Sequence, residues 1–270
     1  MTTFTASDGT VLHYEDRQGS GDVIVLVHGY TGSMRDWDET VPRLPADWRI
    51  IRVDLRGAGD SSHAESGYTI ERYTEDVFEL VLHLDLPRFL LIGHSMGGAI
   101  AAQFTLEHQD LLRGAILLAP APLAGLAPLD PALVAQLEQF RGNVPVMKQM
   151  AQMTFTRPLA DEQIERGVMA NLKVSDGHLK QSLEAMVGLR LADRLRSLRL
   201  PVLMVGGDRD NLVPVQTMLD SFARIPNCGL QIYHRVGHMV QLEVADEFAA
   251  LVQDFAEHDA RKSEAAAARS

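Results

Sequence analysis

The stretch FLLIGHSMGGAIAAQFTLEH, residues 89–108, decides the fold of this chain. It opens with Phe89–Ile92, an apolar run of the length expected for a buried strand, and it closes with an apolar segment that favours a helix. Between them, Gly-His-Ser-Met-Gly-Gly places Ser95 at the corner where a strand turns directly into a helix. We expect strained backbone angles there, and glycines because side chains at the neighbouring positions would collide.

That corner brings a nucleophile and an anion site together. Ser95 Oγ is expected to stand clear of the sheet, and the helix that starts at Met96 points its free N–H groups and its positive dipole end at the same place. The Gly-x-Ser-x-Gly pattern is weak evidence by itself, because short glycine motifs recur by chance. Partners elsewhere in the chain must therefore decide the function.

Composition indicates an ordinary globular protein. A chain of 270 residues, 46% hydrophobic, is long enough for one domain with an insertion. The net charge of −11 and the lack of a dense basic cluster disfavour nucleic acid as a partner. The single cysteine, Cys228, excludes a disulfide within the chain and suits a reducing, cytoplasmic compartment. We expect no signal peptide and no membrane span, because prolines interrupt the longest apolar run, Gly114–Leu129.

Strand and helix signals alternate along most of the chain. Seven further short apolar runs predict strands: Phe4–Ala6, Val11–Tyr14, Val23–Val27, Ile50–Val53, Ala115–Leu118, Val202–Val205 and Leu230–Tyr233. Helical spacing is present from Ile70 to Leu84, with Thr69 as the expected N-cap, and again from Val244 to Phe255. A hairpin followed by alternating strands and helices predicts an α/β fold, with a mostly parallel eight-stranded sheet covered by helices on both faces.

The alternation stops between Ala121 and about Leu198, where only helical stretches are found. About 75 residues are too many for a loop in a compact domain, so we interpret them as a helical cap inserted over the carboxyl edge of the sheet. The predicted organisation is a core of residues 1–120 and 199–260, a cap of residues 121–198 and a disordered tail of residues 261–270.

A serine hydroxyl needs a histidine base, and that base needs an acceptor on its other ring nitrogen. Acid candidates follow the strand at Val202–Val205, namely Asp208 and Asp210, and base candidates follow the last strand, namely His234 and His238. All four leave the carboxyl ends of strands, where ligands bind in open α/β sheets. The chain order Ser, Asp, His is the order found in proteins with a nucleophile elbow of this kind.

Taken together, these motifs resemble the α/β-hydrolase superfamily, in the group with a helical cap that includes esterases, lactonases and C–C bond hydrolases. The resemblance covers Val11 to Phe255. It lies in the His-Gly loop at 28–29, the Asp-x-x-Gly-x-Gly-x-Ser turn at 54–61, the elbow, the Asp-x-x-x-Pro loop at 210–214 and the Gly-His-x-x-x-x-Glu loop at 237–243. Two departures, Ala58 in place of a common His and Ala245 in place of a common Pro, leave the subfamily open.

The resemblance implies a role for each site residue. Ser95 is the nucleophile, His238 the base, and Asp210, four residues before Pro214, the acid; the backbone N–H groups of Tyr30 and Met96 form the oxyanion hole. Asp208 is the alternative acid, in which case Asp210 caps the helix near Pro214. We expect four other residues to have no catalytic role: His28 and Asp54 order their loops, His234 lies at the surface, and His94 is one of many residues that the elbow tolerates.

The predicted function is hydrolysis of a small-molecule carboxylic ester or lactone, with no cofactor. The segment Asp54–Ser61 contains Gly-x-Gly but lacks the third glycine of a dinucleotide site, and no His-Glu-x-x-His or paired cysteines indicate a metal. Methionines in the predicted cap suit an adaptable pocket for a small to medium hydrophobic acyl group, although they equally suit packing. These are Met147, Met150, Met153, Met169 and Met186.

Several alternatives remain open. On the same triad they are a lactonase, a C–C bond hydrolase, a thioesterase and a cofactor-free haloperoxidase; the last is disfavoured because Met96–Ala99 matches its glycine-rich stretch poorly. Outside catalysis, the alternatives are a ligand receptor on this scaffold and a structural relative with a dead site.

Overall fold

A computed structural model describes residues 2–128 and 142–260 of the chain. Eight strands form one sheet in the order β1-β2-β4-β3-β5-β6-β7-β8. The strands are β1 (Thr2–Thr5), β2 (Val11–Arg17), β3 (Val23–Val27), β4 (Arg49–Val53), β5 (Phe89–His94), β6 (Leu112–Leu118), β7 (Val202–Gly207) and β8 (Cys228–Tyr233). Strand β2 pairs antiparallel with β1 and β4, and all other pairs are parallel. The predicted eight-stranded, mostly parallel sheet is therefore confirmed.

Strand β2 is longer than predicted. The apolar pattern ends at Tyr14, yet pairing with β4 continues to Arg17. The additional residues are polar, and their side chains form cross-strand ion pairs: Arg52 binds Glu15 at 2.6 Å and Arg49 binds Asp16 at 2.8 Å. Cross-strand pairs of opposite charge stabilise a strand that hydrophobic patterning alone does not reveal.

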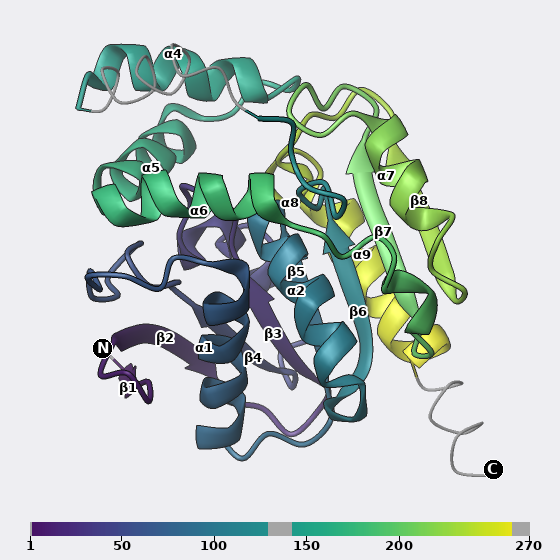
Figure 1. The fold of residues 1–270 in the computed structure, drawn as a ribbon. Coiled ribbons are helices and arrows are strands. Elements are labelled where there is room, and N and C mark those ends of the chain that lie inside the picture. The colour runs from purple at the N-terminus through teal and green to yellow at the C-terminus, as the bar shows by residue number, and fades with distance from the viewer. Residues whose placement is uncertain (1, 129–141, 261–270) are drawn as a thin grey trace, which may run out of the picture.

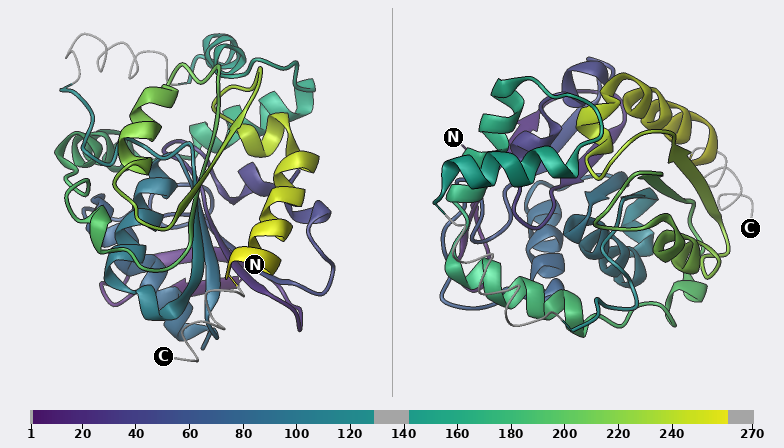
Figure 2. Two further views of the ribbon diagram at one scale, coloured as in Figure 1. Left: turned by 90° about the vertical axis from the view of Figure 1, so that its right-hand side faces the viewer. Right: turned by 90° about the horizontal axis from the view of Figure 1, so that it is seen from above.

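Helices cover both faces of the sheet (Figures 1 and 2). Helices α1 (Ile70–His83) and α2 (Met96–Glu107) pack on one face, and α8 (Val240–Glu243) and α9 (Ala245–Asp254) lie on the other, with α7 (Val215–Phe222) beside β7 and β8. Thr69 caps α1 as predicted, its hydroxyl accepting from Arg72 N–H. The predicted closing helix is confirmed as α9, and the short helix α8 precedes it; Val244, between the two, leaves helical geometry at φ −139°. Among the helices of the described ranges, none has the length and apolar composition needed to cross a bilayer.

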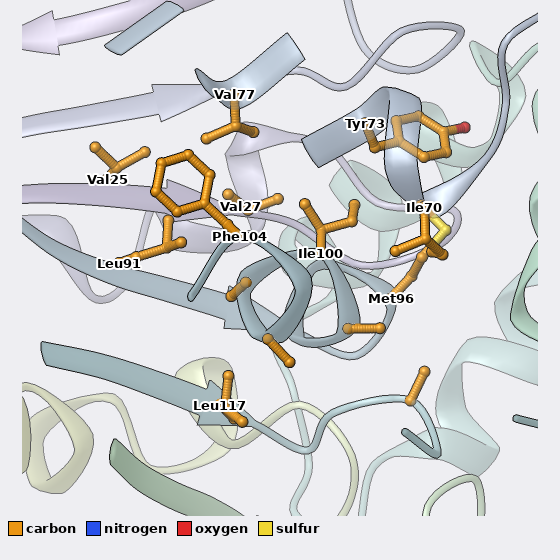
Figure 3. Packing of buried hydrophobic residues seen from close by; sticks show 14 of the residues in the cluster. Val25, Val27, Ile70, Tyr73, Val77, Leu91, Met96, Ile100, Phe104 and Leu117 are labelled. Atoms are coloured by element: carbon orange, nitrogen blue, oxygen red, sulfur yellow. The ribbon is translucent and has the colours of Figure 1, made fainter. Parts of the chain in front are cut away.

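Helix α2 is buried against the sheet and against α1 (Figure 3). Its residues from Met96 to Thr105 are all buried, so it has no polar face. Ile100 and Phe104 pack in one core cluster with Leu91 of β5, and Val77 of α1 belongs to the same cluster. This packing holds the start of α2, and with it the strand-to-helix corner, in a fixed place relative to the sheet.

Between β6 and β7 the described chain forms three helices, which we call the insertion helices: α4 (Val144–Thr154), α5 (Asp161–Leu172) and α6 (Asp176–Gly188). They lie beyond the end of the sheet at which β5 runs into α2 (Figure 1). Met147 and Met186 are buried as a packing role requires, whereas Met169 is 57% exposed. The side chains of Met150 and Met153, part of the predicted cap (residues 129–141) and the predicted tail (residues 261–270) lie outside the described residues.

Candidate active site

The corner between β5 and α2 has the strained backbone that the sequence predicts. Ser95 adopts φ 55° and ψ −116°, a conformation that a non-glycine residue holds only when its surroundings impose it. A Cβ atom built on Gly93 would overlap the carbonyl oxygen of Gly97, and one built on Gly97 would overlap that of Val27. The two glycines therefore let α2 approach the strands closely enough to force Ser95 into the turn.

The Ser95 side chain is half-buried and does not cap its own helix. Its backbone is held on both sides, since its N–H donates to Leu118 O at 2.9 Å and its carbonyl accepts from Ala121 N–H at 2.8 Å. In the part of the chain that the structure describes, Ser95 Oγ makes no hydrogen bond to protein. Catalytic hydrogen bonds of this kind are commonly long in free enzymes and tighten when substrate binds.

His238 and Asp210 form a buried pair at the carboxyl edge of the sheet. His238 Nδ1 lies 2.7 Å from Asp210 Oδ2, and both side chains are almost fully excluded from solvent. The other carboxylate oxygen, Oδ1, accepts from the N–H groups of Leu212 and Val213 at 2.8 Å each. Because an ionised carboxylate only accepts, Nδ1 of His238 carries the proton and Nε2 keeps its lone pair.

Asp208, the alternative acid, lies in a different environment. Its Oδ2 contacts His234 Nδ1 at 2.7 Å, and its Oδ1 accepts from Arg235 N–H at 2.7 Å. The His234 side chain is 74% exposed, in agreement with the surface position predicted for it. Pro214, not Asp210, occupies the N-cap of α7, without a side-chain cap. The geometry thus assigns the two carboxylates to different histidines.

His94 has a contact that no sequence pattern indicated. Its Nε2 donates to the backbone oxygen of His238 at 3.1 Å, and the two imidazole rings lie 4.7 Å apart. His94, the residue before Ser95, therefore ties the elbow to the backbone of His238, a contact that goes beyond the prediction that the elbow tolerates many residues at this position. Burial lowers the pKa of His94 well below its usual value, so the ring is neutral.

The loop after β3 borders the serine. A Cβ atom built on Gly29 would lie 3.2 Å from Ser95 Cβ, so the loop backbone passes close to the Ser95 side chain. His28 orders this loop as predicted, because its Nδ1 donates to Gly29 O at 2.7 Å and its Nε2 accepts from Leu55 N–H at 3.0 Å. The next residue, Tyr30, carries one of the two N–H groups that the resemblance assigns to the oxyanion hole.

Known proteins resemble this chain along most of its length. The family model described as the alpha/beta hydrolase fold matches residues 22–245. The chain belongs to the α/β-hydrolase family. It is 30% identical to a non-heme haloperoxidase of Rhodococcus erythropolis, over 95% of this chain and 100% of that protein. It is 26% identical to the pimeloyl-[acyl-carrier protein] methyl ester esterase of Vibrio atlanticus, over 88% of this chain and 96% of that one.

A solved structure extends the similarity to three dimensions. The esterase EaEST of Exiguobacterium antarcticum superposes with a TM-score of 0.86 at 25% identity, over 94% of this chain and 98% of that one. The α/β-hydrolase fold that the motifs predict is thus confirmed along nearly the whole chain.

In this α/β hydrolase, the loop of residues 237–243, which carries His238, is also hydrogen-bonded to the segment between α4 and α5. Glu243, the last residue of the Gly-His-x-x-x-x-Glu motif, is buried, and its Oε1 accepts from Gly237 N–H at 2.9 Å. Its Oε2 accepts from the N–H and hydroxyl groups of Thr156 at 3.0 and 2.8 Å and from Arg157 N–H at 3.0 Å. The Glu243 carboxylate therefore joins Gly237, the residue before His238, to the segment between α4 and α5.

Asp54 orders the turn after β4, as the sequence predicts. Asp54 accepts from Met34 N–H at 2.8 Å and from Asp60 N–H at 2.9 Å, and it contacts His13. His13, Asp54 and Asp60 are close enough together to hold a metal ion. The Lys173 ammonium binds Asp60, so one of the three groups already has a cationic partner.

A cavity of about 50 Å³ lies between α5 and the short segment Met34–Trp37 of this hydrolase, and Met239 and Leu242 border it. Asp36, Arg166 and Met239 are among its lining residues, and Ser95, Asp210 and His238 are not. Burial raises the pKa of Asp36 to about 7. The cavity holds only a few water molecules, so we do not assign it to the substrate.

The buried His178 side chain, on α6, makes the stability of this hydrolase depend on pH in the acid range. Burial lowers the pKa of His178 to about 4, against about 6.5 in an unfolded chain. Between these pH values the unfolded state binds the additional proton, so native stability falls as pH falls through this window and levels off below it.

Replacing His178 by glutamine removes this titration. The stability of H178Q should fall less than that of the wild type between pH 7 and pH 4, by about 3 kcal/mol. Urea unfolding at both pH values measures this difference in the free energy of unfolding. The contribution from titration of Asp36 is the same in both proteins and cancels in the comparison. Parallel losses in the two proteins would contradict a buried neutral imidazole.

Proposed function

We propose that this protein is a serine hydrolase that cleaves carboxylic esters through Ser95, His238 and Asp210. The observation that carries the proposal is the buried His238–Asp210 pair, which leaves Nε2 as a base on the edge of the sheet where the strained Ser95 stands. His94 links the two sides, because it precedes Ser95 in the chain and hydrogen-bonds the backbone of His238. Together these contacts support a nucleophile, a base and an orienting acid.

In the first half of the reaction, Ser95 Oγ attacks the ester carbonyl carbon while its proton passes to His238 Nε2. The carbonyl oxygen becomes an oxyanion that faces the N–H groups of Met96 and Tyr30, and each such donor typically lowers the barrier by about 3 kcal/mol. The tetrahedral intermediate collapses when the C–O bond to the alcohol breaks, and the alcohol leaves with the proton from Nε2.

In the second half, water attacks the acyl-enzyme and gives its proton to Nε2. The bond between the acyl carbon and Oγ breaks, Oγ recovers the proton, and a carboxylic acid leaves. Asp210 stays ionised throughout and stabilises the imidazolium that forms twice in the cycle. No step requires a redox group, since no atom changes its oxidation state.

We further propose that the insertion helices cap this site and select a small to medium hydrophobic acyl group. The placement of the helices over the end of the sheet at which β5 runs into α2 supports this assignment. A small-molecule ester or lactone is then the partner, and a cytoplasmic location suits the single thiol, Cys228.

A panel of substrates tests the proposed activity. p-Nitrophenyl acetate, butyrate and octanoate, a γ- and a δ-lactone, a vinylogous 1,5-diketone and an acyl thioester are offered at neutral pH. We expect the p-nitrophenyl esters to turn over at least tenfold faster than the diketone, with a burst of p-nitrophenol that reports the acyl-enzyme. Because relatives include a haloperoxidase, peroxide-dependent bromination is assayed alongside.

The result has clear alternatives. Faster turnover of lactones would transfer the assignment to a lactonase on the same residues, and diketone cleavage would transfer it to C–C bond hydrolysis. Bromination faster than ester cleavage would favour the haloperoxidase reading. If no ester is turned over, the proposal fails and a ligand receptor on this fold becomes the better account.

A further inference from the structure

Tyr30, whose N–H group is one of the two proposed oxyanion donors, is held by helix α6. His178 Nε2 donates to the Tyr30 carbonyl oxygen, and the Tyr30 hydroxyl donates to the backbone oxygen of Leu179. The Tyr30 and His178 rings are stacked, with centroids 5.8 Å apart and planes inclined by 16°. Two consecutive residues of α6 therefore hold Tyr30 by its backbone, its ring and its hydroxyl.

The environment of His178 fixes which nitrogen donates. The ring is fully buried, and Nδ1 lies 2.8 Å from the Tyr73 hydroxyl and 3.1 Å from the carbonyl oxygen of Arg56. Each ring nitrogen faces a carbonyl oxygen, and a neutral imidazole has only one N–H group. With the proton on Nε2 the ring binds both the Tyr30 oxygen and the Tyr73 hydroxyl, whereas with the proton on Nδ1 two lone pairs would meet at Tyr30, so we assign the proton to Nε2 and leave the Nδ1 contact with Arg56 without a hydrogen bond. Nδ1 then accepts from Tyr73, whose oxygen accepts in turn from Ser182 Oγ at 2.6 Å. A buried chain of hydrogen bonds thus selects the tautomer that binds the loop.

The two sides of the Tyr30 N–H group are anchored to different parts of the molecule. The preceding residue, Gly29, is held by His28 of the core, through its carbonyl oxygen at 2.7 Å. Tyr30 itself is held by α6. The Gly29 carbonyl and the Tyr30 N–H group belong to one planar peptide, so His28 holds this peptide directly, while α6 holds the residue at its far end through the next carbonyl and the side chain. The direction of the N–H group therefore depends on both anchors, including where α6 sits relative to the sheet.

We propose that His178 is a positioning residue that aims the Tyr30 N–H group at the oxyanion, so that the oxyanion hole is complete only when α6 is seated. The inference rests on the proposed function, because the direction of this N–H group matters only where an oxyanion forms. On this proposal, α6 contributes to catalysis by positioning Tyr30, in addition to lining the proposed acyl pocket.

A purely structural role is the competing account, since a buried polar chain also joins α6 to α1. Two variants separate the accounts. His178→Phe keeps an aromatic ring of similar shape but removes the donor to Tyr30, whereas His178→Gln places an amide N–H near the position of Nε2. Ser182→Ala is the matched control, because Ser182 is equally buried on the same helix and bonds Tyr73 but not Tyr30.

We expect kcat for p-nitrophenyl butyrate to fall about 10- to 100-fold in H178F with KM changed less than about threefold, as loss of a transition-state contact predicts. H178Q should keep at least about a third of the wild-type kcat, and S182A should stay within about threefold of it. Amide hydrogen exchange of residues 28–34 should quicken in H178F and not in S182A.

Should H178F fail to fold, Tyr30→Phe provides a second test, because it keeps the ring and the backbone and removes the hydroxyl that donates to Leu179. We expect about a 3- to 10-fold lower kcat and faster exchange over residues 28–34 in Y30F. Unchanged kcat and exchange in Y30F would overturn the proposal. Equal losses of kcat in H178F and S182A would also overturn it, because the network would then act through stability alone.

The exchange measurement keeps this inference separable from the proposed function. A wild type that cleaves no ester defeats the proposed function, while exchange over residues 28–34 still reports whether His178 holds the loop. Faster exchange in H178F would then support the anchoring of Tyr30, and identical exchange in H178F and the wild type would overturn it.

Discussion

Ser95→Ala should reduce ester turnover by about 10⁵- to 10⁶-fold, the largest effect of any single change in this protein. The hydroxyl is the only atom removed, and Ser95 is held in its strained conformation by backbone contacts to Leu118 and Ala121 that alanine retains. The fold should therefore survive, and the residual rate should reflect binding and the oxyanion donors alone.

Two measurements on the same preparation check this result. Initial rates with p-nitrophenyl butyrate give the fold-change in kcat, and a fluorophosphonate probe should label the wild type stoichiometrically and leave S95A unlabelled. The far-UV circular dichroism spectrum and the melting temperature serve as controls for folding. A loss of less than about 100-fold would remove Ser95 from the role of nucleophile.

Asp210→Asn should reduce kcat by about 10⁴-fold and leave the fold intact. An asparagine oxygen can still accept from Leu212 and Val213 N–H, as Asp210 Oδ1 does. Its NH₂ group then faces His238 Nδ1 and donates to it, so the imidazole is forced into the tautomer with the proton on Nε2. In that tautomer Nε2 has no lone pair with which to accept the serine proton.

Asp208→Asn is the matched control for this variant. Asp208 lies two residues away in the same loop and also contacts a histidine, but that histidine, His234, is largely exposed. D208N should keep kcat within about threefold of the wild type, because an exposed pair contributes little. If D208N loses activity and D210N keeps it, the assignment of the two carboxylates must be exchanged.

The sequence was sufficient to predict the sheet, because buried strands and their connecting helices have strong hydrophobic periods. All eight strands form near the predicted positions, and the extension of β2 to Arg17 was missed only because ion pairs replace apolar alternation there. The elbow was equally predictable, since Gly93 and Gly97 have no room for side chains once β5 turns into α2. Such local constraints are encoded in neighbouring residues.

Contacts between distant segments could not be predicted in this way. The family resemblance favours Asp210 over Asp208 as the acid, but only the folded loop shows that Asp210 meets His238 while Asp208 meets His234. The link from His178 to Tyr30 spans 148 positions and has no pattern that marks it.

The chain by itself therefore determined the α/β-hydrolase fold, the corner serine and a short set of candidate acids and bases, because these depend on local spacing and hydrophobic period. Tertiary structure alone decided that Asp208 pairs with the exposed His234, that His94 ties the backbone of His238 to the elbow, and that α6 holds Tyr30. The physical reason is that a hydrogen bond requires a donor and an acceptor within about 3 Å of each other, and only the packed core brings separate loops within that distance.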